Sequence, residues 1–147
     1  MTKINLTKLK TNFIVNYQNL TPTDSYDNLE KSNIDKGRVS EILCVGFLSE
    51  IHYSKLLSIL EHWYEYMSPG GELLITDKDY DIISNNIANN ILDLEQINKV
   101  LYGDNSKSIY NIANISTVLM SVGFIIDEMS YNGIYFNVTA KKPDTSN

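Results

Sequence analysis

Two short stretches of this sequence hold side chains that could do acid-base or metal chemistry. In the first, Asp77-Lys78-Asp79-Tyr80-Asp81 places three carboxylates directly after the apolar run Glu72–Thr76. Carboxylates at the end of a buried strand lie where α/β proteins usually bind ligands, and they could transfer protons or hold a metal ion. The alternative is a polar loop in which Asp81 caps the next helix.

In the second stretch, His62 stands beside Glu61 and one helical turn before Glu65. Histidine is a common general base and metal ligand, yet a histidine among carboxylates on a helix surface is usually only solvated. His52 is predicted near the start of the same helix, and no third ligand is spaced to join the two histidines. We therefore predict no catalytic residue and no metal site.

Composition and charge limit the class of protein. With 147 residues and 43% hydrophobic content, the chain has the size of one domain with a packed core. A net charge of -6 and a single arginine, Arg38, leave no dense basic patch for nucleic acid. No window approaches the roughly 18 apolar residues of a membrane span, so we expect no membrane contact and a cytoplasmic location. The only cysteine, Cys44, lies in the apolar run ILCVGFL without a positive neighbour, which predicts a buried, unreactive thiol.

Apolar runs and amphipathic segments alternate along the chain and predict strands alternating with helices. The predicted strands are Lys3–Leu6, Asn12–Tyr17, Ser40–Phe47, Glu72–Thr76, Phe124–Met129 and Tyr135–Ala140. The predicted helices are His52–Met67, one or two within Tyr80–Tyr102, and Asn111–Val122. Trp63 is expected on the buried face of the first helix. The pattern predicts a single α/β domain whose mostly parallel sheet ends in an antiparallel hairpin turned at Asn132-Gly133.

The stretch ILEHWYEYMSPGGELLIT, residues 59–76, resembles a helix, Pro-Gly-Gly turn and strand of small class I S-adenosylmethionine-dependent methyltransferases. LEQINKVLYG and VLMSVGF resemble later helices of the same proteins. The resemblance covers residues 40–140 as a well-matched core. It implies a single Rossmann-like methyltransferase-type sheet, truncated at its N-terminal side, in one domain over 1–147. Residues 1–39 are then a reduced N-terminal part with a long loop, and 141–147 are a polar tail.

The resemblance also implies a cofactor site that this sequence fills poorly. Such methyltransferases bind S-adenosylmethionine through a glycine-rich loop after the first strand and an acidic residue at the end of the second. Here the loop Thr7–Lys10 has no glycine, and the acidic position is matched by Asn16 or Gln18, which are amides. After the fourth strand, Gly46-Phe47-Leu48-Ser49-Glu50 replaces the His-Val-Leu-Glu-His that the family often shows. We expect no cofactor, and the vestigial cofactor-binding positions are Asn5, Thr7, Asn16 and Gly46.

Our leading interpretation is a catalytically inactive methyltransferase-like domain that acts as a binding or structural protein. Ten tyrosines suit an interaction surface, although most fit a partly buried core equally well, so a protein partner or self-association is expected. Richness in Asn, Ile, Lys and Tyr suggests an AT-rich genome, such as that of a phage or a low-GC bacterium. A phage origin would make this an assembly protein of a virion. The alternative is an S-adenosylmethionine-dependent methyltransferase whose cofactor site is atypical or completed by a partner chain.

Overall fold

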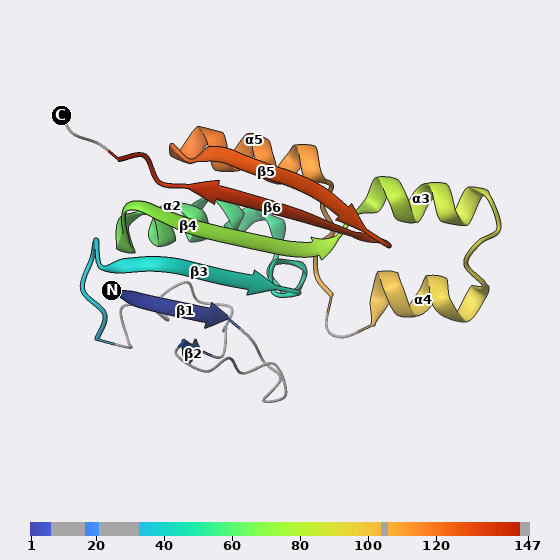
Figure 1. Cartoon of the computed structure of the whole chain (residues 1–147). Helices are drawn as coiled ribbons and strands as arrows, with labels where there is room; N and C mark the ends of the chain where they lie inside the picture. Colours follow the sequence, from blue (N-terminus) through green and yellow to red (C-terminus); the bar gives the residue numbers. More distant parts are fainter. Residues whose placement is uncertain (7–16, 21–32, 104–105, 145–147) are drawn as a thin grey trace.

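The computed structural model describes residues 1–6, 17–20, 33–103 and 106–144. Its strands are β1 (Thr2–Leu6), β2 (Gln18–Leu20), β3 (Val39–Val45), β4 (Met67–Lys78), β5 (Ile125–Asn132) and β6 (Tyr135–Lys141). They form one sheet in the order β2-β1-β3-β4-β6-β5 (Figure 1). The first four of these are parallel, whereas β6 runs antiparallel to β4, and β5 antiparallel to β6. The predicted fold, a mostly parallel α/β sheet with an antiparallel C-terminal hairpin, is confirmed.

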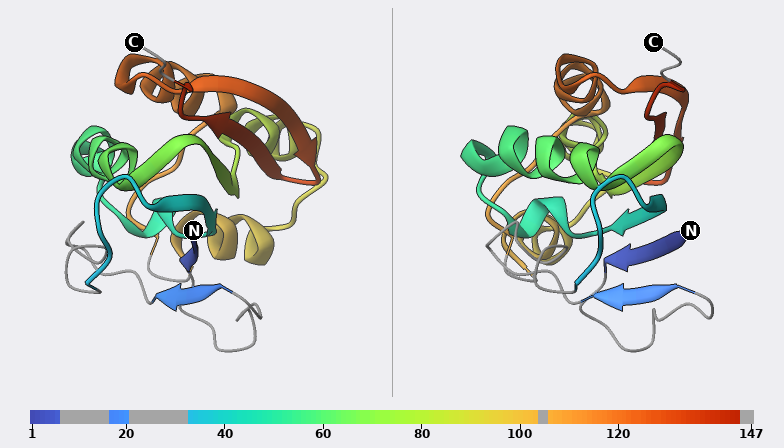
Figure 2. Two further views of the ribbon diagram at one scale, coloured as in Figure 1. Left: turned by 60° about the vertical axis from the view of Figure 1, so that its left-hand side comes forward. Right: turned by 90° about the vertical axis from the view of Figure 1, so that its left-hand side faces the viewer.

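Helices cover one face of this sheet. The described residues form the helices α2 (Leu56–Tyr66), α3 (Tyr80–Ala88), α4 (Leu94–Tyr102) and α5 (Ile112–Val122), with 3-10 turns η2 (Leu48–Glu50) and η3 (Tyr53–Lys55). Helices α2 and α5 lie side by side on the same face, and the opposite face carries no helix within the described residues (Figure 2). Helices α3 and α4 project beyond the carboxyl ends of β3 and β4 (Figure 1). No helix of the described ranges is long and apolar enough to cross a membrane.

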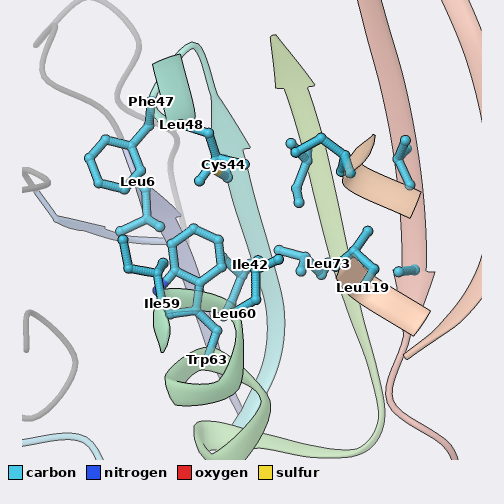
Figure 3. Close-up of a cluster of buried hydrophobic side chains, with 14 of the residues drawn as sticks. Leu6, Ile42, Cys44, Phe47, Leu48, Ile59, Leu60, Trp63, Leu73 and Leu119 are labelled. Carbon is cyan, nitrogen blue, oxygen red and sulfur yellow. The ribbon is translucent and has the colours of Figure 1, made fainter. Parts of the chain in front are cut away.

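The hydrophobic core lies between α2, α5 and the sheet. Strand β4 alternates, so that Leu73 and Ile75 face the helices and are fully buried. Trp63 on α2 is 3% exposed, and its ring centroid lies 6.4 Å from that of Phe47. Figure 3 shows this indole beside Ile59 and the side chains of the neighbouring strands. The expected burial of Trp63 is confirmed.

The Pro-Gly-Gly segment departs from the prediction of a turn that precedes the strand. Strand β4 already begins at Met67 and runs through the glycines. The Gly70 N–H donates to the Lys142 carbonyl (2.8 Å), and the Lys142 N–H donates to the Gly71 carbonyl (2.9 Å). Gly70 takes a φ of 76°, a conformation that glycine adopts without a steric penalty. The start of the predicted polar tail is therefore paired with the sheet.

Candidate functional site

The parallel strands end together at one edge of the sheet, where open α/β sheets bind their ligands. Strand β1 ends at Leu6, which pairs with Cys44 near the end of β3, and Val45 in turn pairs with Thr76 of β4. The short β2 ends at Leu20 beside Leu6. We call this region the carboxyl edge.

Gly46 leaves the backbone open at the carboxyl edge. It follows β3 with a φ of 69°, and its N–H donates to the Thr76 carbonyl at 2.8 Å. A Cβ built on Gly46 would meet nothing within 4 Å, and the neighbouring Val45 is 49% exposed. A ligand can therefore approach this backbone closely, as glycine permits in cofactor-binding loops.

Asn5 brings an amide to the same end of β1. The residue is 3% exposed, and its Nδ2 donates to Oδ1 of Asn19 at 2.8 Å. Asn19 in turn donates from Nδ2 to the Tyr17 carbonyl at 3.1 Å, which holds the amide pair in one orientation. The other two vestigial positions, Thr7 and Asn16, lie outside the described residues.

The position of β2 alters the comparison with the acidic residue that the family carries at the end of its second strand. The predicted strand Asn12–Tyr17 lies mostly outside the described residues, and β2 begins only at Gln18. Gln18 pairs with Ile4, so it opens the strand, and Leu20 ends it at the carboxyl edge. The amide at Gln18 is therefore not at the end of β2 where the family carries its carboxylate. The residues that follow Leu20 lie outside the described part of the chain.

Asp77, the first of the three carboxylates that follow the apolar run Glu72–Thr76, is a buried structural carboxylate. It is the last residue but one of β4, lies on the helical face and is 2% exposed. It accepts hydrogen bonds from the N–H groups of Ser49 (3.0 Å) and Lys78 (2.8 Å). Burial raises the pKa of Asp77, and these two hydrogen bonds oppose the shift. Burial, together with the charge of Asp77, raises the pKa of the fully buried Cys44 thiol. The predicted buried thiol is confirmed.

Asp79, and not Asp81, caps α3. Its Oδ1 accepts from the N–H groups of Asp81 (2.9 Å) and Ile82 (3.2 Å), and its Oδ2 accepts from Ile112 (2.9 Å) at the start of α5. Asp81 is exposed and accepts from Nδ2 of Asn111 at 2.9 Å. The prediction that Asp81 is the cap is wrong, because the extended backbone immediately before α3 belongs to Asp79.

The two histidines lie on different elements. His62 is half-buried on α2 with its ring centroid 4.8 Å from that of Tyr66. His52 is exposed at the start of η3, where its Nδ1 accepts from the Ser54 N–H at 3.3 Å. Within the described residues, no group of three His, Cys, Asp or Glu side chains could hold a metal ion.

Several solved structures with a similar arrangement are methyltransferases. An O-methyltransferase family protein from Burkholderia thailandensis matches with a TM-score of 0.60 at 13% identity, over 87% of this chain and 36% of its own. A SAM-dependent methyltransferase from Archaeoglobus fulgidus matches with a TM-score of 0.60 at 12% identity, over 95% and 74%. Human N-acetylserotonin methyltransferase, solved in complex with SAM, matches with a TM-score of 0.59 at 16% identity, over 97% and 40%.

The likeness is one of structure. No protein-family model matches the sequence, and no curated protein matches it. The chain spans less than half the length of several of the similar structures, 36% of the Burkholderia protein and 40% of the human one.

These structures contradict our prediction that the chain has no cofactor. The human protein was solved with SAM, and 1,6-didemethyltoxoflavin-N1-methyltransferase from Burkholderia thailandensis was solved with S-adenosylhomocysteine. The fold therefore points to S-adenosylmethionine instead of no cofactor. The prediction depended on residues 7–10 and 16, which the structure does not describe, and on a second strand that ends before Gln18, whereas β2 ends at Leu20.

The sheet order gives the same assignment from the structure itself. Four parallel strands, a crossover through α2 and a C-terminal antiparallel hairpin reproduce the arrangement that the resemblance implied. Because the identities are 12% to 16%, the likeness concerns the fold alone. This chain has the fold of the class I S-adenosylmethionine-dependent methyltransferases.

Proposed function

We propose that this chain is an S-adenosylmethionine-binding methyltransferase domain with an atypical cofactor site at the carboxyl edge. The observation that carries the proposal is the open backbone at Gly46, in a fold whose solved examples include methyltransferases. When bound, the cofactor supplies an activated methyl group. This is the enzyme alternative, and the comparisons favour it over an inactive assembly protein of a phage particle.

The described residues fit such a cofactor in two respects. The backbone at Gly46 carries no Cβ that would obstruct a ligand, and Val45 beside it offers exposed apolar surface to a planar base. The Asn5 and Asn19 amides provide neutral hydrogen-bonding groups on the adjacent strands. Neutral hydrogen bonds are weaker than charge-assisted ones, so the amides would contribute modest affinity and orientation.

Calorimetric titration with S-adenosylmethionine tests the proposal, and a matched pair of glycine variants locates the site. Gly46 and Gly37 both have positive φ, of 69° and 76°, and both have open space at the Cβ position. Gly46 lies at the carboxyl end of β3, whereas Gly37 precedes its amino end. A side chain costs similar backbone strain at either position, so only its place in the fold differs.

We expect binding to the unaltered chain, a loss of about tenfold or more in Gly46→Ala, and a change within about twofold in Gly37→Ala, because only the first methyl group would meet the ligand. No binding of S-adenosylmethionine by the unaltered folded chain would overturn the proposed function. Equal losses in the two variants would overturn the role of Gly46.

We also propose that a protein partner or a second copy of the chain contacts the edge strand β5. This strand ends the sheet, and Ile125, Met129 and Tyr131 on it are 55% to 59% exposed. An edge strand with exposed apolar side chains offers both backbone hydrogen bonds and contact area. Light scattering after size exclusion should give a mass above that of one chain, and Met129→Lys should lower it. A single-chain mass at every concentration would contradict self-association.

A further inference from the structure

A pocket of about 630 Å³ lies on the helical side of the carboxyl edge. Its walls come from η3, the start of α2, the end of α4, residues 106–110 and α5. Its apolar lining is formed by Tyr53, Leu56, Leu101, Tyr102, Ile109 and Val118. A volume of this size suits a small organic molecule, and Asn5, Asn19 and Gly46 of the proposed cofactor site do not line it.

Two of the residues that line the pocket carry buried hydroxyl groups. Oγ of Ser108 and the hydroxyl of Tyr110 are buried, and neither has a hydrogen bond of standard geometry within the described residues. Tyr110 is 5% exposed. Burial raises the pKa of Tyr110, while the nearby Ser108 hydroxyl opposes the shift, so the phenol stays protonated at neutral pH and can donate. A buried hydroxyl without a hydrogen bond destabilises the folded chain, and a suitable ligand group would partly recover this loss.

The backbone that carries these hydroxyls is held in place. The N–H groups of Lys107 and Ser108 both donate to the Ser49 carbonyl, at 2.7 Å and 3.0 Å. The Tyr110 carbonyl accepts from the Tyr80 N–H at 2.9 Å. These bonds tie the polar wall to η2 and to the start of α3, so the wall exists before a ligand arrives.

The opening of the pocket is aromatic. Tyr53 and Tyr102 line the pocket yet are 68% and 78% exposed, so their rings stand at its mouth. Aromatic rings favour flat apolar ligands, against which they stack or pack edge to face. The pocket therefore combines apolar walls, an aromatic rim and one pair of hydroxyls.

We propose that this pocket binds a small flat molecule with an apolar ring and one hydroxyl group, that is, a phenol. The ring would pack between Leu56, Leu101 and Val118, and the hydroxyl would bond to Ser108 and Tyr110. A phenolic hydroxyl can both donate and accept, which suits two neighbouring hydroxyl groups. The inference does not depend on the proposed cofactor site.

Binding of p-cresol and toluene tests the inference, because the two probes differ only in the hydroxyl. Methyl NMR spectra should show shifts at Leu56, Leu101 and Val118, with p-cresol binding about tenfold more tightly than toluene, the worth of one good hydrogen bond. Combining Ser108→Ala with Tyr110→Phe should reduce this preference to about twofold and leave toluene binding unchanged. Tyr131→Phe, on the edge strand β5, is the control and should keep the full preference.

Filling the pocket separates this inference from the proposed function. Val118→Trp should abolish the p-cresol shifts and leave the heat of S-adenosylmethionine binding unchanged, after circular dichroism has shown that the variant is folded. If it does not fold, the pair of hydroxyl variants decides the question. Equal binding of p-cresol and toluene, or p-cresol shifts confined to residues away from the pocket, would overturn the inference whatever the cofactor result.

Discussion

At the residue scale, Trp63 is the side chain whose loss should cost most. Its indole is 3% exposed between α2 and the sheet, and α2 presents the 47% exposed Leu57 on another face. Trp63→Ala should lower the free energy of unfolding by about 3–5 kcal/mol through lost burial and a residual cavity. Leu57→Ala should lower it by about 1 kcal/mol or less, since it removes little buried surface. Urea denaturation measures both, and a similar small loss in the two variants would place the indole outside the core.

The buried Asp77 makes stability depend on pH in an unusual direction for an aspartate. Because folding raises its pKa, the folded state binds the proton more tightly than the unfolded chain does, where an aspartate titrates at about 3.9. Its stabilising contribution is therefore full below about pH 3.9 and is lost as the pH rises through the raised value.

Asp77→Asn does not titrate at this position, so it isolates the effect. The free energy of unfolding of the unaltered chain, relative to that of Asp77→Asn, should fall between about pH 4 and the raised pKa and stay level above it. Urea denaturation at a series of pH values measures this difference. A difference that rises with pH would mean that the hydrogen bonds from Ser49 and Lys78 outweigh burial.

At the element scale, two aspartates that cap helices should differ in their contribution to the free energy of unfolding. Asp79 is fully buried and accepts from Asp81, Ile82 and Ile112, so it joins the starts of α3 and α5. Asp93, the exposed cap of α4, accepts from the Gln96 N–H in its capping box and makes no hydrogen bond to another helix among the described residues.

Asp79→Ala should therefore lower the free energy of unfolding by about 2–4 kcal/mol, because it removes a cap and leaves the Ile112 N–H without its acceptor. Asp93→Ala should lower it by about 1 kcal/mol. Thermal or urea melts compare the two. Equal costs would show that the bond to α5 adds nothing to the cap.

At the scale of the whole molecule, α2 and α5 lie against the sheet, whereas α3 and α4 project beyond the carboxyl edge (Figure 1). Helix α2 buries five residues, whereas α4 buries none. Amide hydrogen exchange should therefore be slowest in β3, β4 and α2 and faster in α4, because opening α4 breaks few apolar contacts. Mass spectrometry of deuterium uptake tests this order. Protection of α4 equal to that of α2 would indicate a contact that covers it.

Much of the fold could be predicted from local pattern. Continuous apolar runs predicted β3 and β4, because the inner strands of a parallel sheet carry mostly apolar side chains. Helix α5 was predicted by its amphipathic period and by Gly123, which ends it with a φ of 121°. The hairpin followed from Asn132-Gly133 between two strand-like runs. These elements depend on neighbours in the sequence. The bounds of α5 agree closely with the prediction, whereas β4 begins at Met67, before the predicted start at Glu72.

What the sequence by itself determined is therefore the type and order of the elements and the faces they bury, since periodicity records which side of a strand or helix meets the core. Only the tertiary structure decided what the polar residues do. Asp77 and Asp79 stand two residues apart, yet their partners Ser49 and Ile112 lie 28 and 33 residues away along the chain. The pocket likewise joins residues from Tyr53 to Val118. The physical reason is that a side chain's burial and hydrogen bonds are set by the distant segment packed against it, and no local period specifies that segment.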